Sequence, residues 1–307
     1  FAHADRITLL PAADTAIMES SPEISYNLVA QRHGPAGTTG AMNDSTRTRA
    51  MFRFDLASAI PAGSTIERAS FSLTVQREPV APANSTFVLR RMLVDWIEGT
   101  KNNPENPGGR PASDGEPTWN HRAHPATPWG APGGLAGTDF VIEDSASQLV
   151  TNEAVTSNPT YTWVLNNSGI ADLQDMLDNP ASNYGWMFMT TAEEVDKTAR
   201  RFYFKETLTD RPDRVGPPPE LTIDFTPPEG IPPIEVTDFR SEGSNIELEF
   251  LADAGLSYAI EVNGTLDPNA WTQVQTLEPT EDGPLSASIP IDEQSRKFVR
   301  ITASPGD

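Results

Sequence analysis

The sequence predicts an all-β protein with two parts: a large jelly-roll-like β-sandwich followed by a small immunoglobulin- or fibronectin-like β-sandwich. Its 307 residues include 28 prolines and 21 glycines, which break the chain into many short segments. Short runs that alternate apolar and polar residues recur between these breaks. In the run 65–76, Phe71, Leu73 and Val75 share one side of a two-residue period, as expected for a strand that covers a core with one face.

Turn-forming residues separate the expected strands of the first part. Proline, glycine and asparagine in 60–64, 167–170 and 178–183 are typical of loops. Residues 168–180 have helical spacing, and Ser168 is the expected N-cap. The expected strands are 49–56, 65–76, 85–93, 160–165, 184–191, 200–206 and 219–226.

A proline-rich segment marks the boundary between the two parts. Residues 227–234 hold prolines that lack the backbone N–H group which a central strand needs, so we expect a stiff linker between domains 1–226 and 235–307. The second domain has strand-like runs at the spacing of a small sandwich. These runs are 245–252, 256–264, 270–278, 284–291 and 297–304.

Charge and cysteine content exclude several classes of function. Acidic residues outnumber basic ones by 43 to 22, a net charge of −21, which repels nucleic acid and anionic lipid. No apolar run is long enough to insert into a membrane. The sequence has no cysteine, which excludes disulfides, thiolate metal sites and cysteine nucleophiles. We expect a secreted bacterial protein, extracellular or at the cell surface, whose signal peptide has been removed.

The residue patterns give weak support for catalysis. There is no G-x-S-x-G motif to accompany the four histidines. The pair His121-x-x-His124 is suited to a metal, but zinc would need a third ligand from elsewhere, and surface histidines are the simpler interpretation. A group of carboxylates suits acid–base chemistry, turn capping or calcium binding equally well; it consists of Asp95, Glu98, Asp114 and Glu116. We therefore predict that the protein is not an enzyme and requires no cofactor.

The segment 95–129 gives the best signal for a ligand. Exposed indoles stack on sugar rings while neighbouring polar groups bind the hydroxyls, and the alternative is that these indoles are core residues which pin a long loop. The candidate glycan-binding residues are Trp96, Glu98, Trp119, Asn120 and Trp129. Excess carboxylates also allow a structural Ca²⁺, for which Asp14, Glu19 and Asp55 are the candidate ligands. Arg53 and Asp55 are expected to share one face of a strand and to take part in a paired ion bridge across the sheet.

The order of several motifs resembles a family of secreted bacterial modules. RFDL (53–56), IPAG (60–63), W-x-E-G (96–99), TWN (118–120) and WGAPGG (129–134) follow one another as in DNRLRE domains, which overlap with carbohydrate-binding module family 96. The resemblance covers residues 5–226, and the nearest counterpart of the family's name-giving string is Phe202–Glu206. It implies a jelly-roll-like sandwich that, in some members, binds acidic polysaccharide. Residues 235–307 are similar to small sandwich modules of secreted proteins.

Two functions are compatible with this sequence. The first is a non-catalytic structural or adhesive subunit of an extracellular filament, sheath or surface layer, which associates with itself or with other surface proteins. Strand exchange through the N-terminus would place Phe1, Ile7 and Leu9 at the contact, and the alternative is an edge strand that folds back on its own sheet. The second function is a module that recognises acidic extracellular polysaccharide.

Overall fold

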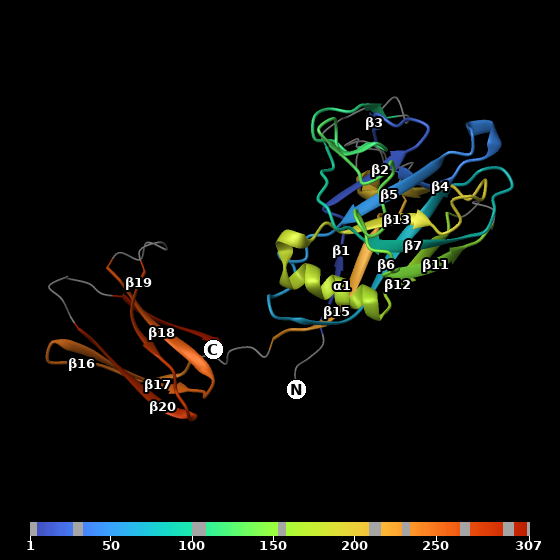
Figure 1. Ribbon diagram of the computed structural model, residues 1–307. Coiled ribbons are helices and arrows are strands. Elements are labelled where there is room, and N and C mark those ends of the chain that lie inside the picture. Colours follow the sequence, from blue (N-terminus) through green and yellow to red (C-terminus); the bar gives the residue numbers. More distant parts are fainter. Residues whose placement is uncertain are drawn as a thin grey trace. The chain divides into compact units, whose positions relative to one another are not determined.

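The computed structural model describes residues 5–26, 33–99, 109–152, 158–208, 216–228, 234–264, 271–290 and 298–305. The chain divides into two compact units, Phe1–Pro228 and Glu229–Asp307, and this division falls inside the predicted linker. Both units consist mainly of antiparallel β-strands, which confirms the predicted all-β class (Figure 1).

The main sheet of the first unit has 11 strands and folds over on itself. Two small sheets accompany it, β3 (Ile24–Ser25) with β8 (Arg110–Pro111) and β9 (His121–Ala123) with β10 (Thr127–Pro128). The strand order is β1-β15-β6-β14-β4-β5-β13-β7-β11, with β12 paired to β6 and β2 paired to β5. The strands are β1 (Asp5–Leu9), β2 (Ala13–Met18), β4 (His33–Thr38), β5 (Arg47–Arg53), β6 (Thr65–Arg77), β7 (Ser85–Arg91), β11 (Ala146–Val150), β12 (Thr160–Val164), β13 (Trp186–Thr190), β14 (Arg200–Tyr203) and β15 (Glu220–Thr226).

The fold-over occurs between β4 and β5, where the register joins Gly37 to Thr48 and Thr38 to Arg47. Gly37 has a φ of 111°, and a Cβ atom there would lie 2.6 Å from the Ala199 backbone. Glycine is therefore required at this corner. Two layers result: β1, β15, β6, β12, β14 and β4 form one, and β2, β5, β13, β7 and β11 form the other.

An aromatic core fills the space between the two layers. The Phe52 and Phe71 ring centroids lie 5.1 Å apart, and those of Trp163 and Phe188 lie 5.0 Å apart. The Trp163 Nε1–H donates to the Phe87 carbonyl at 2.8 Å, which satisfies its polar atom. Helix α1 (Asn167–Asp178) adds Leu173, Met176 and Leu177 to the same core.

The second layer is buried on both faces at β13 and the middle of β5. Every residue of β13 is buried, and in β5 the side chains of Ala50 and Phe52 enter the inner core while Met51 enters a second core on the outside. We call the described residues of the segment 92–141, which are 92–99 and 109–141, the cover, because Trp96, Trp119, Trp129 and Phe140 close this second core. The long connection at the centre of the sequence is therefore a third layer of the unit.

Several predicted elements differ from the structure. Strand β4 is not among the predicted strands, because its sequence, HGPAGT, is rich in glycine and proline. The N-cap of α1 is Asn166, whose side chain accepts from the Gly169 N–H at 2.9 Å, and Ser168 lies inside the helix. The prediction that Arg53 and Asp55 share one strand face is wrong, since β5 ends at Arg53 and Asp55 turns away to accept from the Ser58 N–H at 3.3 Å. Arg53 pairs with Asp95 at 2.9 Å.

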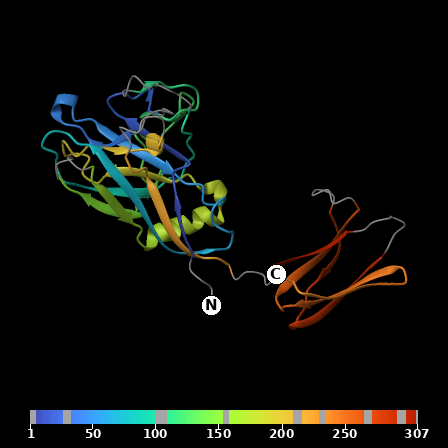
Figure 2. The same cartoon turned by 180° about the vertical axis from the view of Figure 1, so that it is seen from behind.

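The N-terminal strand lies at the edge of the first layer. Ile7 pairs with Ile223 and Leu9 with Leu221 of β15, in the same chain, and the two strands run side by side in Figure 2. The structure thus shows the predicted alternative, an edge strand that folds back on its own sheet. Phe1 lies outside the described residues.

The second unit is a small sandwich of two three-stranded sheets, β16-β17-β20 and β19-β18-β21. Its core includes Phe250, Tyr258 and Ile260. Strand β16 was not predicted, because most of its side chains are exposed and give no alternating pattern. The strands are β16 (Val236–Glu242), β17 (Asn245–Ala252), β18 (Leu256–Asn263), β19 (Thr272–Leu277), β20 (Gly283–Pro290) and β21 (Phe298–Pro305).

Candidate functional site

The three indoles of the cover lie in the core. Trp96, Trp119 and Trp129 are 2%, 2% and 4% exposed, so the prediction that they form a glycan platform is wrong and the alternative of core residues is right. The Trp96 Nε1–H donates to the Tyr184 carbonyl and the Trp129 Nε1–H to the Thr118 carbonyl, each at 2.8 Å. An indole with both its ring and its N–H used inside the protein cannot stack on a sugar.

The carboxylates of the cover hold turns and ion pairs. Glu116, which is buried, accepts from the Ser113 N–H at 2.7 Å, and Asp95 accepts from the Trp96 N–H at 2.8 Å. Glu98 forms an ion pair with Lys205. Of the residues expected to bind a glycan, Glu98 and Asn120 therefore have partners inside the protein, the latter donating to Glu23.

The residues predicted to bind calcium are not brought together. Glu19 pairs with Arg47 at 2.6 Å and Asp55 caps a turn, whereas Asp14 lies with Glu98 and Glu206. A cation is already present at that cluster, because the Lys205 ammonium contacts both Glu98 and Glu206. The predicted trio is wrong because Asp14 and Glu19 lie at distant positions of β2 and its following turn, facing different partners.

Burial makes this carboxylate cluster sensitive to pH. Asp14 is buried, and its Oδ1 makes no hydrogen bond to the described residues. Desolvation and the Glu206 charge raise the Asp14 pKa well above its ordinary value. Desolvation, followed by the Glu98 charge, raises the pKa of Glu206 to about 7. The folded protein therefore keeps a proton here that the unfolded chain releases at lower pH.

We expect Glu206→Gln to remove a pH dependence of stability. Because the folded pKa of Glu206 lies above its ordinary value of 4.5, this group lowers the free energy of unfolding as the pH rises from 4.5 to about 7. Glutamine imitates the protonated acid at every pH. Measured by urea unfolding, the free energy of unfolding of the variant should rise relative to that of the natural sequence by about 1–3 kcal/mol between pH 5 and pH 8. The exposed Glu194→Gln is the control, and parallel pH curves for all three proteins would refute the assignment.

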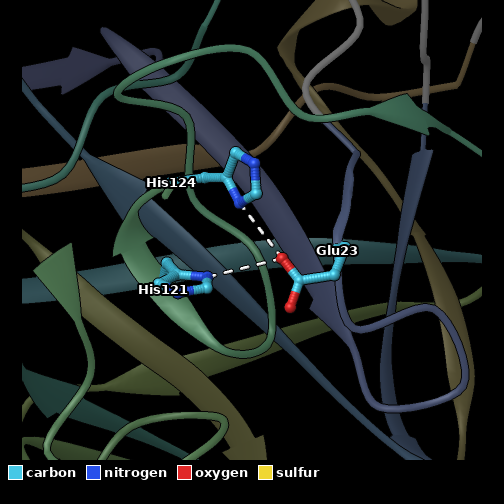
Figure 3. Close-up of side chains that lie close together, drawn as sticks. All are labelled: Glu23, His121 and His124. Carbon is cyan, nitrogen blue, oxygen red and sulfur yellow. Dashed lines mark ion pairs between the residues drawn. The ribbon is translucent and has the colours of Figure 1, made fainter. Parts of the chain in front are cut away.

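A second cluster, half-exposed, joins Glu23 to His121 and His124. The Glu23 Oε2 lies 3.4 Å from the His121 Nδ1 and 3.0 Å from the His124 Nδ1, so the two rings converge on one oxygen (Figure 3). Glu23 comes from the turn after β2, and the histidines from strand β9 (His121–Ala123) and the residue after it. Sequence reasoning found the histidines but missed Glu23, which is distant in the chain.

A groove of about 300 Å³ lies over β4, β6 and β14. Its lining includes Tyr26, His33, Arg77, Glu78 and Arg201. Arg77 and Arg201 face each other on adjacent antiparallel strands, and neither has a described hydrogen bond or ion pair. Burial and the neighbouring Arg77 charge lower the pKa of the Arg201 guanidinium. Sequence reasoning did not predict this groove, because β4 was not recognised as a strand.

Among the described residues, no helix is long and apolar enough to cross a membrane. Comparison of the chain with models of protein families and with curated proteins finds no match.

Proposed function

We propose that the protein is a non-catalytic adhesive subunit of a bacterial extracellular surface, which holds acidic polysaccharide in the groove of Arg77 and Arg201. The observation that carries the proposal is the pairing of these two arginines across β6 and β14 without a described acidic partner. Like charges directly opposite one another destabilise a sheet. In a chain with a net charge of −21, such a pair is best explained by an anionic ligand.

The chemistry of the groove suits a uronic acid polymer. A guanidinium binds a carboxylate through two parallel hydrogen bonds, and two adjacent guanidinium groups match the repeated carboxylates of such a chain. The one acid of the lining, Glu78, lies 3.5 Å from the buried Arg200, which offsets its charge. Tyr26 and Pro35 add apolar surface beside the arginines. The groove therefore combines positive charge with the ring surfaces that a sugar contacts.

The non-catalytic part of the proposal is supported by the roles of the other polar residues. Four carboxylates of the cover were candidates for acid–base chemistry. Three of them, Asp95, Glu98 and Glu116, are used in turns and ion pairs, and Asp114 is exposed. Extracellular location remains our expectation from the residue composition and the resemblance to secreted modules.

The test is affinity gel electrophoresis in alginate, in polygalacturonate and in neutral dextran. We expect both acidic polymers to retard the protein and dextran to have no effect. Replacing both groove arginines, Arg77→Gln with Arg201→Gln, should weaken binding by about 100-fold or more, because each arginine loses at least one charge-assisted hydrogen bond of about 1.5–3 kcal/mol. Binding should also weaken as salt is added.

A matched control removes the same charge elsewhere. Arg6 and Arg68 lie beside Asp224 and are 70% and 82% exposed, so Arg6→Gln with Arg68→Gln changes the net charge equally outside the groove. This control should bind as tightly as the natural sequence. If the two double variants lose the same affinity for the acidic polymers, the effect is one of net charge, and the groove is not the binding site. An absence of retardation in both acidic polymers would refute the function itself.

A further inference from the structure

We propose that Glu23, His121 and His124 form a binding site for a divalent transition metal of the zinc type. The site is separate from the arginine groove and does not depend on the function proposed for it. One ligand atom from each of the three residues lies within 4.8 Å of the other two. Three features support the assignment: the spacing of these atoms, the lack of any described partner but Glu23 for the two nitrogens, and the hydrogen-bonded backbone around them.

The spacing matches the geometry of zinc. Nitrogen and oxygen ligands at about 2.0–2.1 Å from a tetrahedral Zn²⁺ lie about 3.3 Å from each other. The two measured separations from the Glu23 Oε2 are 3.4 Å to the His121 Nδ1 and 3.0 Å to the His124 Nδ1 (Figure 3). The ring centroids are 5.2 Å apart at an interplanar angle of 82°, so the two imidazoles approach from different directions.

The nitrogen atoms that face Glu23 have no other use. Both Nδ1 atoms are buried, and neither has a partner among the described residues other than the Glu23 carboxylate. A neutral imidazole offers such a nitrogen as a metal ligand. The carboxylate is oriented by Asn120, whose Nδ2 donates to the Glu23 Oε1 at 2.6 Å and leaves Oε2 to face the histidines. Asn120 is thus a positioning residue of the kind that metal ligands require.

The backbone around the site is fixed by hydrogen bonds. The His121 N–H donates to the Thr118 Oγ1 at 3.0 Å, and the His124 N–H donates to the Glu116 carbonyl at 2.9 Å. The turn that carries Glu23 is tied to the cover, since its carbonyl accepts from the Ala112 N–H at 3.1 Å. The ligands are therefore held in place before a metal arrives.

The type of metal follows from the ligands. Two imidazoles with one carboxylate suit Zn²⁺, Cu²⁺ or Ni²⁺, whereas Ca²⁺ requires six to eight oxygen atoms. The side chains are 21%, 23% and 49% exposed for His121, His124 and Glu23, which leaves a fourth position open to water. The net charge of −21 favours the approach of a cation. A bound metal would fasten the cover to the turn after β2.

The test uses the full chain without an affinity tag. We expect isothermal titration with Zn²⁺ to give one site, and Co²⁺ to show the d–d absorption of tetrahedral nitrogen and oxygen coordination. A 100-fold excess of Zn²⁺ over its Kd should raise the Tm of the first unit by about 5–10 °C. Ca²⁺ and Mg²⁺ should leave the Tm unchanged.

Variants locate the metal. His121→Gln, His124→Gln and Glu23→Gln should each abolish the Zn²⁺-dependent rise in Tm, and Asn120→Ala should weaken binding by about 10- to 100-fold. His33→Gln removes a histidine from another part of the unit and should bind Zn²⁺ like the natural sequence. No heat of binding with the natural sequence, or the same Tm rise in all three ligand variants, would overturn the proposal. The heat of Zn²⁺ binding is measured on the natural sequence. The test therefore remains decisive even if one of the variants fails to fold.

Discussion

Trp119→Ala is expected to destabilise the first unit by about 3–5 kcal/mol, the usual effect of deleting a large buried aromatic side chain. The indole is 2% exposed and lies beneath the guanidinium groups of Arg47 and Arg49, at 5.3 and 5.6 Å from its centroid. Gly133 packs so closely on it that a Cβ atom there would lie 2.6 Å from the ring. Alanine would therefore leave a cavity that the fixed loop around Gly133 cannot fill.

Urea unfolding followed by tryptophan fluorescence measures this effect. The matched control is Trp271→Ala, since Trp271 lies in the second unit, is not buried and contacts Arg300. This control should leave the transition of the first unit unchanged. At a temperature where the Trp119 variant is folded, it should still bind alginate. A loss of binding with unchanged stability would show that the indole contacts the sugar after all.

Arg49→Gln is expected to cost the first unit about 3–5 kcal/mol as well, because it leaves the Glu193 carboxylate, whose side chain is only 15% exposed, without its partner. Arg49 is 6% exposed, and its guanidinium donates to both oxygens of Glu193 at 2.7 Å and to the Gly133 carbonyl at 2.8 Å. One side chain thus joins β5 to the loop after β13 and to the cover. Glutamine is too short to reach all three acceptors.

A second arginine on the same strand and the same face provides the comparison. Arg53 pairs with Asp95, but the two side chains are 28% and 55% exposed. Exposed ion pairs contribute about 0–1 kcal/mol, so Arg53→Gln should have a small effect. Thermal unfolding of both variants at equal salt measures the difference. If both variants lose the same stability, the burial of Arg49 does not strengthen its ion pair.

The sequence pattern predicted the regular parts of the fold well. Strands such as β6 and β15 alternate apolar and polar residues because each has one face in the core, and the period therefore shows in the sequence. Strands β5 and β13 overlap the runs 49–56 and 184–191, which the sequence predicts as strands. The pattern could not show that both faces of β13 are buried, because the second face is covered by a segment distant in the chain.

The candidate sites were harder to predict, because each depends on residues that are far apart in the chain. Glu23 and His121 are brought together by the cover, and Arg77 and Arg201 by strand pairing. Tryptophan in a long polar loop is typical both of sugar platforms and of loops that fold onto a sheet. Such a tryptophan becomes a core residue when an apolar surface lies within its reach. In this protein the outer face of β5 and β13 is that surface.

Strand β6 would carry the mechanical load in the adhesive function that we propose. Arg77 at one end of the strand belongs to the groove, and Thr65 at the other end pairs with Thr226, the last residue of β15 before the chain leaves the unit. Tension between a held polymer and the rest of the chain therefore runs along about 40 Å of a single strand. Such a force shears the hydrogen bonds between β6 and β15 together, so that they share the load, and does not open them one at a time.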